Sequence, residues 1–383
     1  MPNDPNRVSE AASPVRDIEP SAPQEGIGLC LSGGGYRAMV FHIGALWRLN
    51  EAGYLVKLDR ISSVSGGSIT AGVLGLHWTR LQFDASGVAQ RFNEEVVAPL
   101  RDLAGRTLDA KAVVGGILLP GTIAEYIASA YDKHLFKGAD LQALPDKPRF
   151  VINATNVQSG ALWRFSKPYM ADYRVGQLDK PTTQLAMAVG ASSAFPPFLS
   201  PATMELPRGA VKEVAGVDLH REPFTTQVVL TDGGVYDNLG LETVWKKYKT
   251  VLVSDAGGKM QPEPEPHQDW VQHMVRVLDV IDNQVRSLRK RQVIDAYEAG
   301  ERRGGYWGIR TNIVDYKLPG AMPCPFDRTT ELANTPTRLQ RMESALQERL
   351  INWGYAVCDA ALRKHVDPNI KAPRGFPYPG SGI

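Results

Sequence analysis

The sequence predicts an α/β protein with a mostly parallel sheet flanked by helices. From Gly26 onward, short apolar runs alternate along the chain with segments that carry helical periodicity. Several of these runs lack the polar alternation of a half-exposed strand, as expected for parallel strands that are buried on both faces. The 43% hydrophobic content is ordinary for such a globular core.

The apolar runs predict five strands, at Gly28–Leu31, Arg60–Val64, Arg149–Asn153, Gln227–Leu230 and Thr250–Ser254. The helical patterns predict five helices, at Arg37–Ala52, Gly67–Trp78, Thr122–Tyr131, Thr183–Gly190 and Asn238–Lys247. The stretch from Pro201 to Thr226 has no strong period and is expected to be a surface excursion.

Two longer helices are expected near the C-terminus. The first covers His267–Arg303, where spacings of three and four alternate along one apolar stripe of Val271, Met274, Leu278, Ile281, Val285 and Leu288. Core packing and a contact that controls activity are both open as uses of this stripe. The second helix is expected to begin at Thr335-Pro336, because threonine is a good N-cap and proline suits the first helical position.

The domain organisation is expected to be simple. Residues 1–24 are rich in proline, serine and charge without any period, which predicts a disordered segment. Residues 25–383 show no repeat and no clear linker, so we expect one domain with helical C-terminal additions. No secretory signal or membrane span is expected, because even the most apolar stretch, Ala112–Leu119, is short and contains glycines.

Composition excludes several classes of function. The net charge of +2 argues against a nucleic-acid-binding surface. The three cysteines form neither a disulfide framework nor a zinc pattern, so no metal or cofactor is expected, and a reducing, cytoplasmic location fits best. A homo-oligomer stays open. So does a transient peripheral membrane contact through the basic cluster Arg286, Arg289, Lys290 and Arg291, although such a run is more often a solvated helix face.

A serine follows the second predicted strand in Ser63-Val64-Ser65-Gly66-Gly67. A sharp turn from a strand to a helix can expose a serine nucleophile, and it requires small residues because the two elements nearly touch. The usual pattern is G-x-S-x-G, and Ser63 here replaces the first glycine with another small residue. By itself this segment fits a nucleophile and a plain capped turn equally well.

The first predicted strand ends in Ser32-Gly33-Gly34-Gly35. Backbone N–H groups of consecutive glycines can approach a phosphate or a developing oxyanion, and the helix that follows adds its positive end. The loop does not match the nucleoside-triphosphate pattern. A dinucleotide site would need an acid at the end of the next strand, where this chain has serine and glycine. An oxyanion hole therefore fits better, with an empty tight turn as the alternative.

The fourth predicted strand leads into Asp232-Gly233-Gly234, so that the Asp232 carboxylate stands at the carboxyl end of this strand. Because ligands collect at the carboxyl ends of parallel strands, we expect Asp232 to lie at the same sheet edge as Ser65. Asp255 at the end of the next strand is a competitor, and a turn or cap role is common for either residue. No histidine stands where a Ser–Asp–His triad would need it, and His42 is expected to pack on the first helix.

These segments, in this order, resemble the patatin-like phospholipases and their cytosolic phospholipase relatives. The resemblance includes a fourth segment, Gly190–Phe198, and covers roughly residues 26–258. It implies a three-layer α/β fold and a serine hydrolase with a Ser–Asp dyad and no histidine. Carried over, Ser65 is the nucleophile that forms the acyl-enzyme, Asp232 is the base, and Gly33, Gly34 and Gly35 form the oxyanion hole. Arg37 either attracts an anionic head group or pairs with a surface acid.

The expected activity is therefore that of a lipid acyl hydrolase of the phospholipase A or lysophospholipase type, acting on phospholipid or lysophospholipid. A general carboxylesterase or lipase is the nearest alternative. A signal-gated effector phospholipase is another. A lipid-binding protein without turnover fits less well, because both Ser65 and Asp232 are present.

Overall fold

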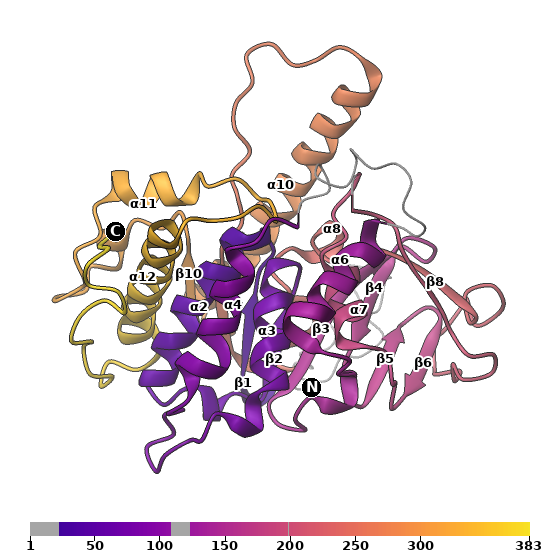
Figure 1. The fold of residues 1–383 in the computed structure, drawn as a ribbon, viewed down its shortest axis with the longest axis horizontal. Helices are drawn as coiled ribbons and strands as arrows, with labels where there is room; N and C mark the ends of the chain where they lie inside the picture. The colour runs from indigo at the N-terminus through magenta and orange to yellow at the C-terminus, as the bar shows by residue number, and fades with distance from the viewer. Residues whose placement is uncertain (1–22, 109–122, 198) are drawn as a thin grey trace, which may run out of the picture.

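The computed structural model describes residues 23–108, 123–197 and 199–383 (Figure 1). The expected disorder of residues 1–24 falls almost entirely outside the described residues, as does the apolar stretch Ala112–Leu119. Gln24 already belongs to the first strand. None of the helices in the described ranges is long and apolar enough to cross a bilayer.

One sheet organises the chain. Its parallel half contains, in spatial order, β10 (Arg303–Gly308), β9 (Tyr248–Asp255), β1 (Gln24–Leu31), β2 (Arg60–Ser63) and β3 (Arg149–Asn156). Its antiparallel half contains β4 (Ala161–Phe165), β5 (Tyr169–Asp172), β6 (Gly176–Asp179), β7 (Ala202–Glu205) and β8 (Gln227–Asp232). All five strands expected from the sequence are confirmed, with small differences at their ends.

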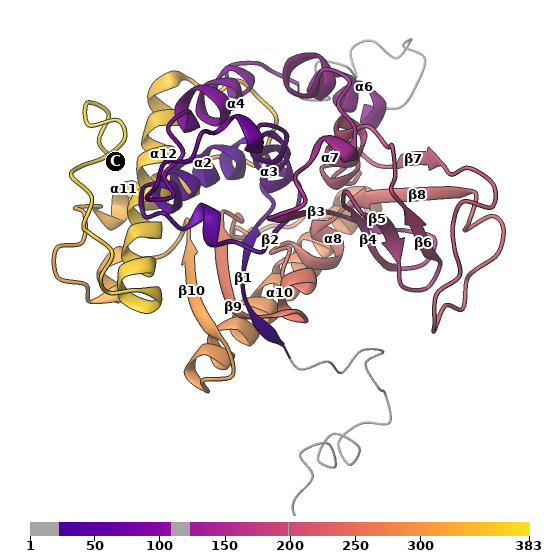
Figure 2. The ribbon, with the colours of Figure 1, turned by 90° about the horizontal axis from the view of Figure 1, so that it is seen from below.

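The helices cover both faces of this sheet (Figure 2). They are α2 (Gly35–Glu51), α3 (Gly66–Leu76), α4 (Ala98–Ala104), α6 (Ile123–Tyr131), α7 (Leu185–Ser192), α8 (Gly234–Asp237), α9 (Glu242–Trp245), α10 (Trp270–Glu298), α11 (Phe326–Ala333) and α12 (Ser344–Ala361). Helices α2, α3 and α12 pack on one face, whereas α9 and the inner end of α10 pack on the other. The mostly parallel, helix-flanked architecture predicted from the sequence is confirmed.

The antiparallel strand β8 decides where the candidate site lies. Strand β2 pairs with the first half of β3, ending where Ser63 lies opposite Ile152. Strand β8 pairs with the second half of β3, and its last residue, Asp232, lies opposite Ala154. Strand β4 occupies the other side of β3 at this point. Strand β8 therefore lies on the same side of β3 as β2 and begins its pairing beyond the point where β2 ends. The carboxyl ends of β2 and β8 therefore approach each other.

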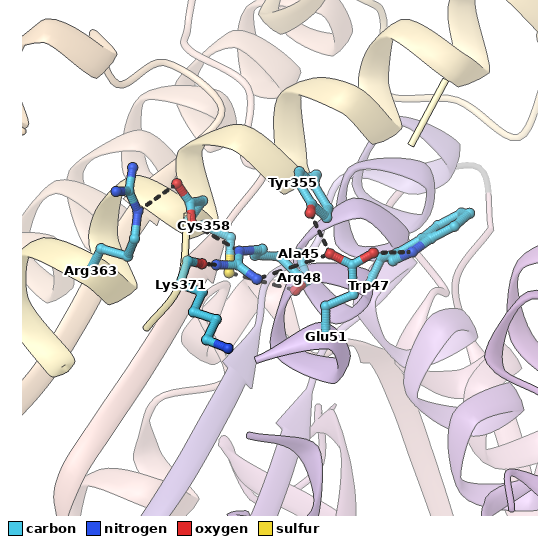
Figure 3. Close-up of polar contacts among 9 residues, drawn as sticks. Ala45, Trp47, Arg48, Glu51, Tyr355, Cys358, Arg363 and Lys371 are labelled. Atoms are coloured by element: carbon cyan, nitrogen blue, oxygen red, sulfur yellow. Dashed lines mark hydrogen bonds and ion pairs between the residues drawn. The ribbon is translucent and has the colours of Figure 1, made fainter. Parts of the chain in front are cut away.

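Helices α2 and α12 cross in close contact. A Cβ atom on Gly354 would overlap the carbonyl oxygen of Phe41, so the two backbones touch at this crossing. Polar contacts secure the pair further along (Figure 3). The buried Arg48 donates to Asp359 at 2.8 Å and to the carbonyl oxygen of Lys371 at 2.6 Å. Arg363 neutralises the other oxygen of the same carboxylate at 3.0 Å.

Two helix predictions are wrong. Of the single helix expected over Asn238–Lys247 only the short α9 forms, because Gly240, at φ 67°, interrupts the helical backbone between α8 and α9. The last long helix begins at Ser344 and not at Thr335-Pro336. Residues 335–343 instead form a non-helical segment whose backbone bonds to other elements, as in the 2.7 Å bond from Leu108 N to Leu339 O.

Candidate active site

Ser65 occupies a strained turn between β2 and α3. Its backbone has φ 51° and ψ −122°, values that residues with a side chain rarely adopt. The next residue must be glycine, because a Cβ atom on Gly66 would overlap the carbonyl oxygen of Gly35 in the neighbouring loop. Ser65 keeps 8% of its surface exposed. The geometry matches the strand–serine–helix turn that presents a nucleophile.

The buried hydroxyl groups of Ser63, Ser68 and Ser192 form hydrogen bonds next to this turn. Ser63, which stands where the usual pattern has glycine, is fully buried and accepts a hydrogen bond from the Ser68 hydroxyl at 3.0 Å. The Ser68 hydroxyl also lies 2.9 Å from that of Ser192. The Ser63 hydroxyl, which the usual glycine would lack, is therefore hydrogen-bonded within the network of Ser68 and Ser192 and is not left unpaired.

The glycine loop after β1 lies directly beside Ser65. A Cβ atom on Gly33 would lie 3.2 Å from the Ser65 Cβ. Gly34 and Gly35 have φ values of 140° and 59°, which favour glycine. The N–H group of Gly33 donates to the carbonyl oxygen of Asn238 at 3.0 Å, whereas those of Gly34 and Gly35 have no hydrogen-bond partner in the described part of the chain. Among the described residues, therefore, these two donors at the start of α2 are unpaired.

Asp232 brings a carboxyl group to the same place from β8. It is 2% exposed. Its Oδ1 accepts a hydrogen bond from Gly234 N at 2.7 Å, and its Oδ2 has no good hydrogen bond within the described residues. Burial raises the pKa of Asp232 from 3.8 to about 7, although the Gly234 N–H group and the nearby Ser65 hydroxyl act in the opposite direction. This carboxyl group can therefore take up a proton near neutral pH.

Asp255, the competing acid, is in a different state. The Tyr306 hydroxyl donates to it at 2.6 Å and Gly257 N at 2.8 Å. Burial raises the pKa of Asp255, but Arg286 and Tyr306 lower it more, so that its pKa lies below the usual range. A carboxylate held in this way is a poor proton acceptor.

The segment that follows α7 connects the serine to the acid. Ser65 N donates to the Ser192 hydroxyl at 3.0 Å, and that hydroxyl donates to Asn153 O at 2.6 Å. Two residues later, Ala194 O accepts from Asp232 N at 2.9 Å. The sequence marked Gly190–Phe198 only through its resemblance to a family, and nothing in the residues themselves indicated that Ser192 bonds to the Ser65 backbone.

Two further neighbours carry no sequence signal. The side chain of Asn238 lies between the glycine loop and the turn after Asp232, because Cβ atoms added to Gly33 or Gly234 would both meet its Oδ1. Tyr131, at the end of α6, is fully buried. Burial raises the pKa of Tyr131 above its usual range, and the charge of Asp232 adds to this rise.

His42 has a structural role, in contact with Ser32 and Ser254. The ring of His42 lies 3.0 Å from Ser32 O and 2.8 Å from the Ser254 hydroxyl, and burial lowers its pKa to about 4. All seven histidines are among the described residues, and none of them hydrogen-bonds to Ser65 or Asp232.

Arg37 does not make the surface ion pair that the sequence suggests. It is 3% exposed, and it donates to Ala256 O at 3.1 Å and to Thr335 O at 2.6 Å. These two bonds join the start of α2 to β9 and to the segment before α12. Burial lowers the pKa of Arg37 to about 10. Elsewhere in the described ranges, no group of three His, Cys, Asp or Glu side chains is placed to hold a metal ion.

With this geometry in view, comparisons with known proteins are informative. Residues 29–245, more than half of the chain, match the family described as patatin-like phospholipase. The chain belongs to the patatin-like phospholipase family. The matched region contains the glycine loop, Ser65 and Asp232.

A solved structure agrees with this assignment at the level of the fold. The patatin-like chain is similar to human GIVD cytosolic phospholipase A2, with a TM-score of 0.51 and 13% identity over 89% of this chain. The same human enzyme with methyl γ-linolenyl fluorophosphonate and terbium chloride gives a TM-score of 0.49 at 13% identity, covering 93% of this chain and 60% of the other. This chain spans 61% of the human enzyme in the first comparison. No curated protein sequence matches it.

Proposed function

We propose that this patatin-like protein is a lipid acyl hydrolase of the phospholipase A or lysophospholipase type, with Ser65 as nucleophile and Asp232 as base. The observation that carries this proposal is the state of Asp232. Its carboxyl group is buried next to the Ser65 hydroxyl, has an oxygen without a good hydrogen bond, and has a pKa of about 7. A general base is most effective when its pKa lies near the working pH.

The reaction has two halves. Ser65 Oγ attacks the ester carbonyl carbon while Asp232 takes the hydroxyl proton. The alcohol part of the lipid then leaves with that proton, and the fatty acyl group stays on Ser65. Water attacks the acyl-enzyme, and Asp232 takes a proton from the water. The fatty acid leaves, the proton returns to Ser65 Oγ, and the free enzyme is restored.

Gly34 and Gly35 are the proposed oxyanion donors, because their N–H groups have no partner within the described ranges and lie at the positive end of α2. Such donors are typically worth roughly 3–4 kcal/mol each in the transition state. Gly33 N–H is already bonded to Asn238 O, so Gly33 contributes through its small size, which lets the loop approach Ser65.

Arg37 is proposed to hold this loop in place. Its Nε and Nη1 groups bond to backbone carbonyls, and this distinguishes it from a free head-group ligand.

The proposal predicts that a fluorophosphonate probe labels Ser65 covalently and that Ser65→Ala removes the label, as read by peptide mass spectrometry. A lipid-binding protein without turnover would leave every serine unlabelled. Release of fatty acid from phosphatidylcholine, lysophosphatidylcholine and a short-chain ester then separates a phospholipase from a general esterase.

The base is tested by comparing Asp232→Asn with Asp255→Asn on the short-chain ester. We expect Asp232→Asn to lower kcat by about 10²–10⁴-fold, the usual contribution of a general base. Asp255→Asn is the matched control, since it removes an equally buried carboxylate whose pKa is shifted the other way. Loss of activity in Asp255→Asn alone would contradict the assignment.

A further inference from the structure

Helix α10 extends beyond the body of the protein (Figure 1). Of its 29 residues only Val293 and Ala296, close to its inner end, are buried. Core packing, one of the two uses left open for the apolar stripe, does not cover it, because five of its six residues are open to solvent. The exposed fractions are 51% for Val271, 53% for Met274, 45% for Leu278, 54% for Ile281 and 51% for Leu288. Trp270, at the start of the helix, is 79% exposed.

A contiguous exposed apolar stripe of this kind indicates an interaction surface, because soluble monomers expose few contiguous apolar patches. Its spacing indicates the kind of partner. The stripe, which we call the seam, contains Val271, Met274, Leu278, Ile281, Val285 and Leu288. Strict alternation of three and four residues is the pattern of a helix that packs against another helix in a coiled coil.

The seam is symmetric about its own centre. When two copies of α10 lie antiparallel, Val271 meets Leu288 of the other copy, Met274 meets Val285, and Leu278 meets Ile281. Every position then has an apolar partner, and no seam residue is left over. A surface that is complementary to itself in this way is what a two-fold symmetric dimer requires.

Charge agrees with this orientation. Residues 268–274, at the outer end of the helix, carry one acidic residue, Asp269, and no lysine or arginine. Residues 285–291 carry four basic residues and no acidic one. Antiparallel packing places residues 268–274 of one copy opposite residues 285–291 of the other, so that Asp269 faces the basic end at both ends of the seam.

The same charges argue against an anionic membrane as the partner. The acidic outer end would be repelled by anionic lipid. The basic cluster is in part neutralised or occupied within the chain. Arg289 lies 3.2 Å from Glu242, Arg286 lies 3.9 Å from Asp282, and Lys290 lies over the ring of Tyr306.

We propose that a second copy of this chain covers the seam, and that the protein forms a two-fold symmetric dimer through antiparallel α10 helices. This interface does not depend on the proposed hydrolase activity. Helix α10 packs against α8, the helix that follows Asp232 and Gly233, so the interface is linked to the candidate site through one helix.

The test is the mass of the protein in solution, measured by light scattering after size exclusion over a range of concentrations. The wild-type chain is expected to be a dimer. Leu278→Glu combined with Ile281→Glu places four carboxylates at the centre of the seam and is expected to give a monomer. Val280→Glu is the matched control, because Val280 is 49% exposed on the same helix but lies outside the seam, and it is expected to leave the dimer intact.

Orientation is tested with cysteines, since the three native cysteines are buried. Val271→Cys combined with Leu288→Cys is expected to give a disulfide-linked dimer under oxidation. Val271→Cys alone is expected to give none, because the two copies of residue 271 then lie about 26 Å apart at 1.5 Å per residue. Cross-linking by Val271→Cys alone would indicate parallel helices and overturn the antiparallel dimer.

A wild-type chain that is monomeric at every concentration would overturn the proposal. If the Leu278→Glu and Ile281→Glu changes then abolished binding to phosphatidylcholine vesicles, a lipid surface would be the partner. Fluorophosphonate labelling of Ser65 in each variant shows that the fold is intact, and it separates failure of the dimer from failure of the proposed function.

Discussion

Ser65 stores backbone strain at the point where the nucleophile is presented. A residue with a side chain at φ 51° and ψ −122° costs roughly 1–3 kcal/mol relative to relaxed backbone. The hydrogen bond from Ser65 N to Ser192 and the tight contact between Gly66 and the glycine loop hold the turn in this conformation. Stability is thus given up locally to expose one hydroxyl group.

This strain leads to a prediction at the residue scale. Both Ser65→Ala and Ser65→Gly remove the hydroxyl, but only glycine tolerates the backbone angles. After the entropy cost of glycine, about 0.5–1 kcal/mol, is subtracted, we expect Ser65→Gly to be the more stable of the two by about 1 kcal/mol. Urea unfolding of the two variants measures this difference. A Ser65→Gly variant that is less stable than Ser65→Ala by about 0.5–1 kcal/mol would show that the turn is not strained.

At the scale of elements, the packing of α12 against α2 fixes the position of the glycine loop. Helix α2 begins in that loop, and its axis is held by the contact at Gly354 and by the buried ion pair of Arg48 with Asp359. Because α12 lies near the end of the chain, the loop depends on a helix that is distant in sequence.

The crossing predicts the effect of Gly354→Ala. Alanine is the better helix former by about 1 kcal/mol, so intrinsic preference alone would stabilise α12. The added Cβ atom would overlap Phe41 O, however, and overpacking typically costs about 1–3 kcal/mol. We expect net destabilisation, measured by thermal unfolding. Gly375→Ala, where nothing lies within 4 Å of the new atom, is the control and is expected to be neutral.

For the whole molecule, the titration of Asp232 couples activity to stability. Its pKa is about 7 in the folded protein and near 3.8 in the unfolded chain. Between these values the folded state binds the proton more tightly. The free energy of unfolding therefore falls as pH rises from about 4 to about 7, by at most roughly 4 kcal/mol. The same loss of the proton creates the base that Ser65 requires.

We therefore expect hydrolysis of the short-chain ester to increase as pH rises through about 7, while the stability contributed by this group decreases. Asp232→Asn, whose activity is expected to be strongly reduced, is also expected to be more stable than wild type at about pH 8, with little difference in stability at about pH 4. Urea titrations at both pH values measure this. A variant that is less stable than wild type at about pH 8 would contradict the raised pKa.

The predictions from the sequence were right where a feature depends on neighbouring residues and wrong where it depends on residues distant in the chain. Ser65, the glycine loop and Asp232 could each be selected because an apolar strand followed by small residues is a local pattern. The reason given for bringing Asp232 to Ser65 was wrong in one respect. They were expected at one edge of parallel strands, but β8 is antiparallel and meets the end of β2 directly. Pairing between strands distant in sequence leaves no local signal.

The sequence by itself determined where the main strands lie, the turns that follow them and the residue types that chemistry needs, because these depend on neighbours within a few positions. Only the tertiary structure decided which acid has a raised pKa, that Ser192 supports the serine, that Arg37 is buried and that the α10 seam is exposed. Burial, hydrogen-bond partners and the fields of nearby charges come from residues far apart in the chain. Asp232 and Asp255 look alike in sequence, and their surroundings make one a candidate base and the other a fixed carboxylate.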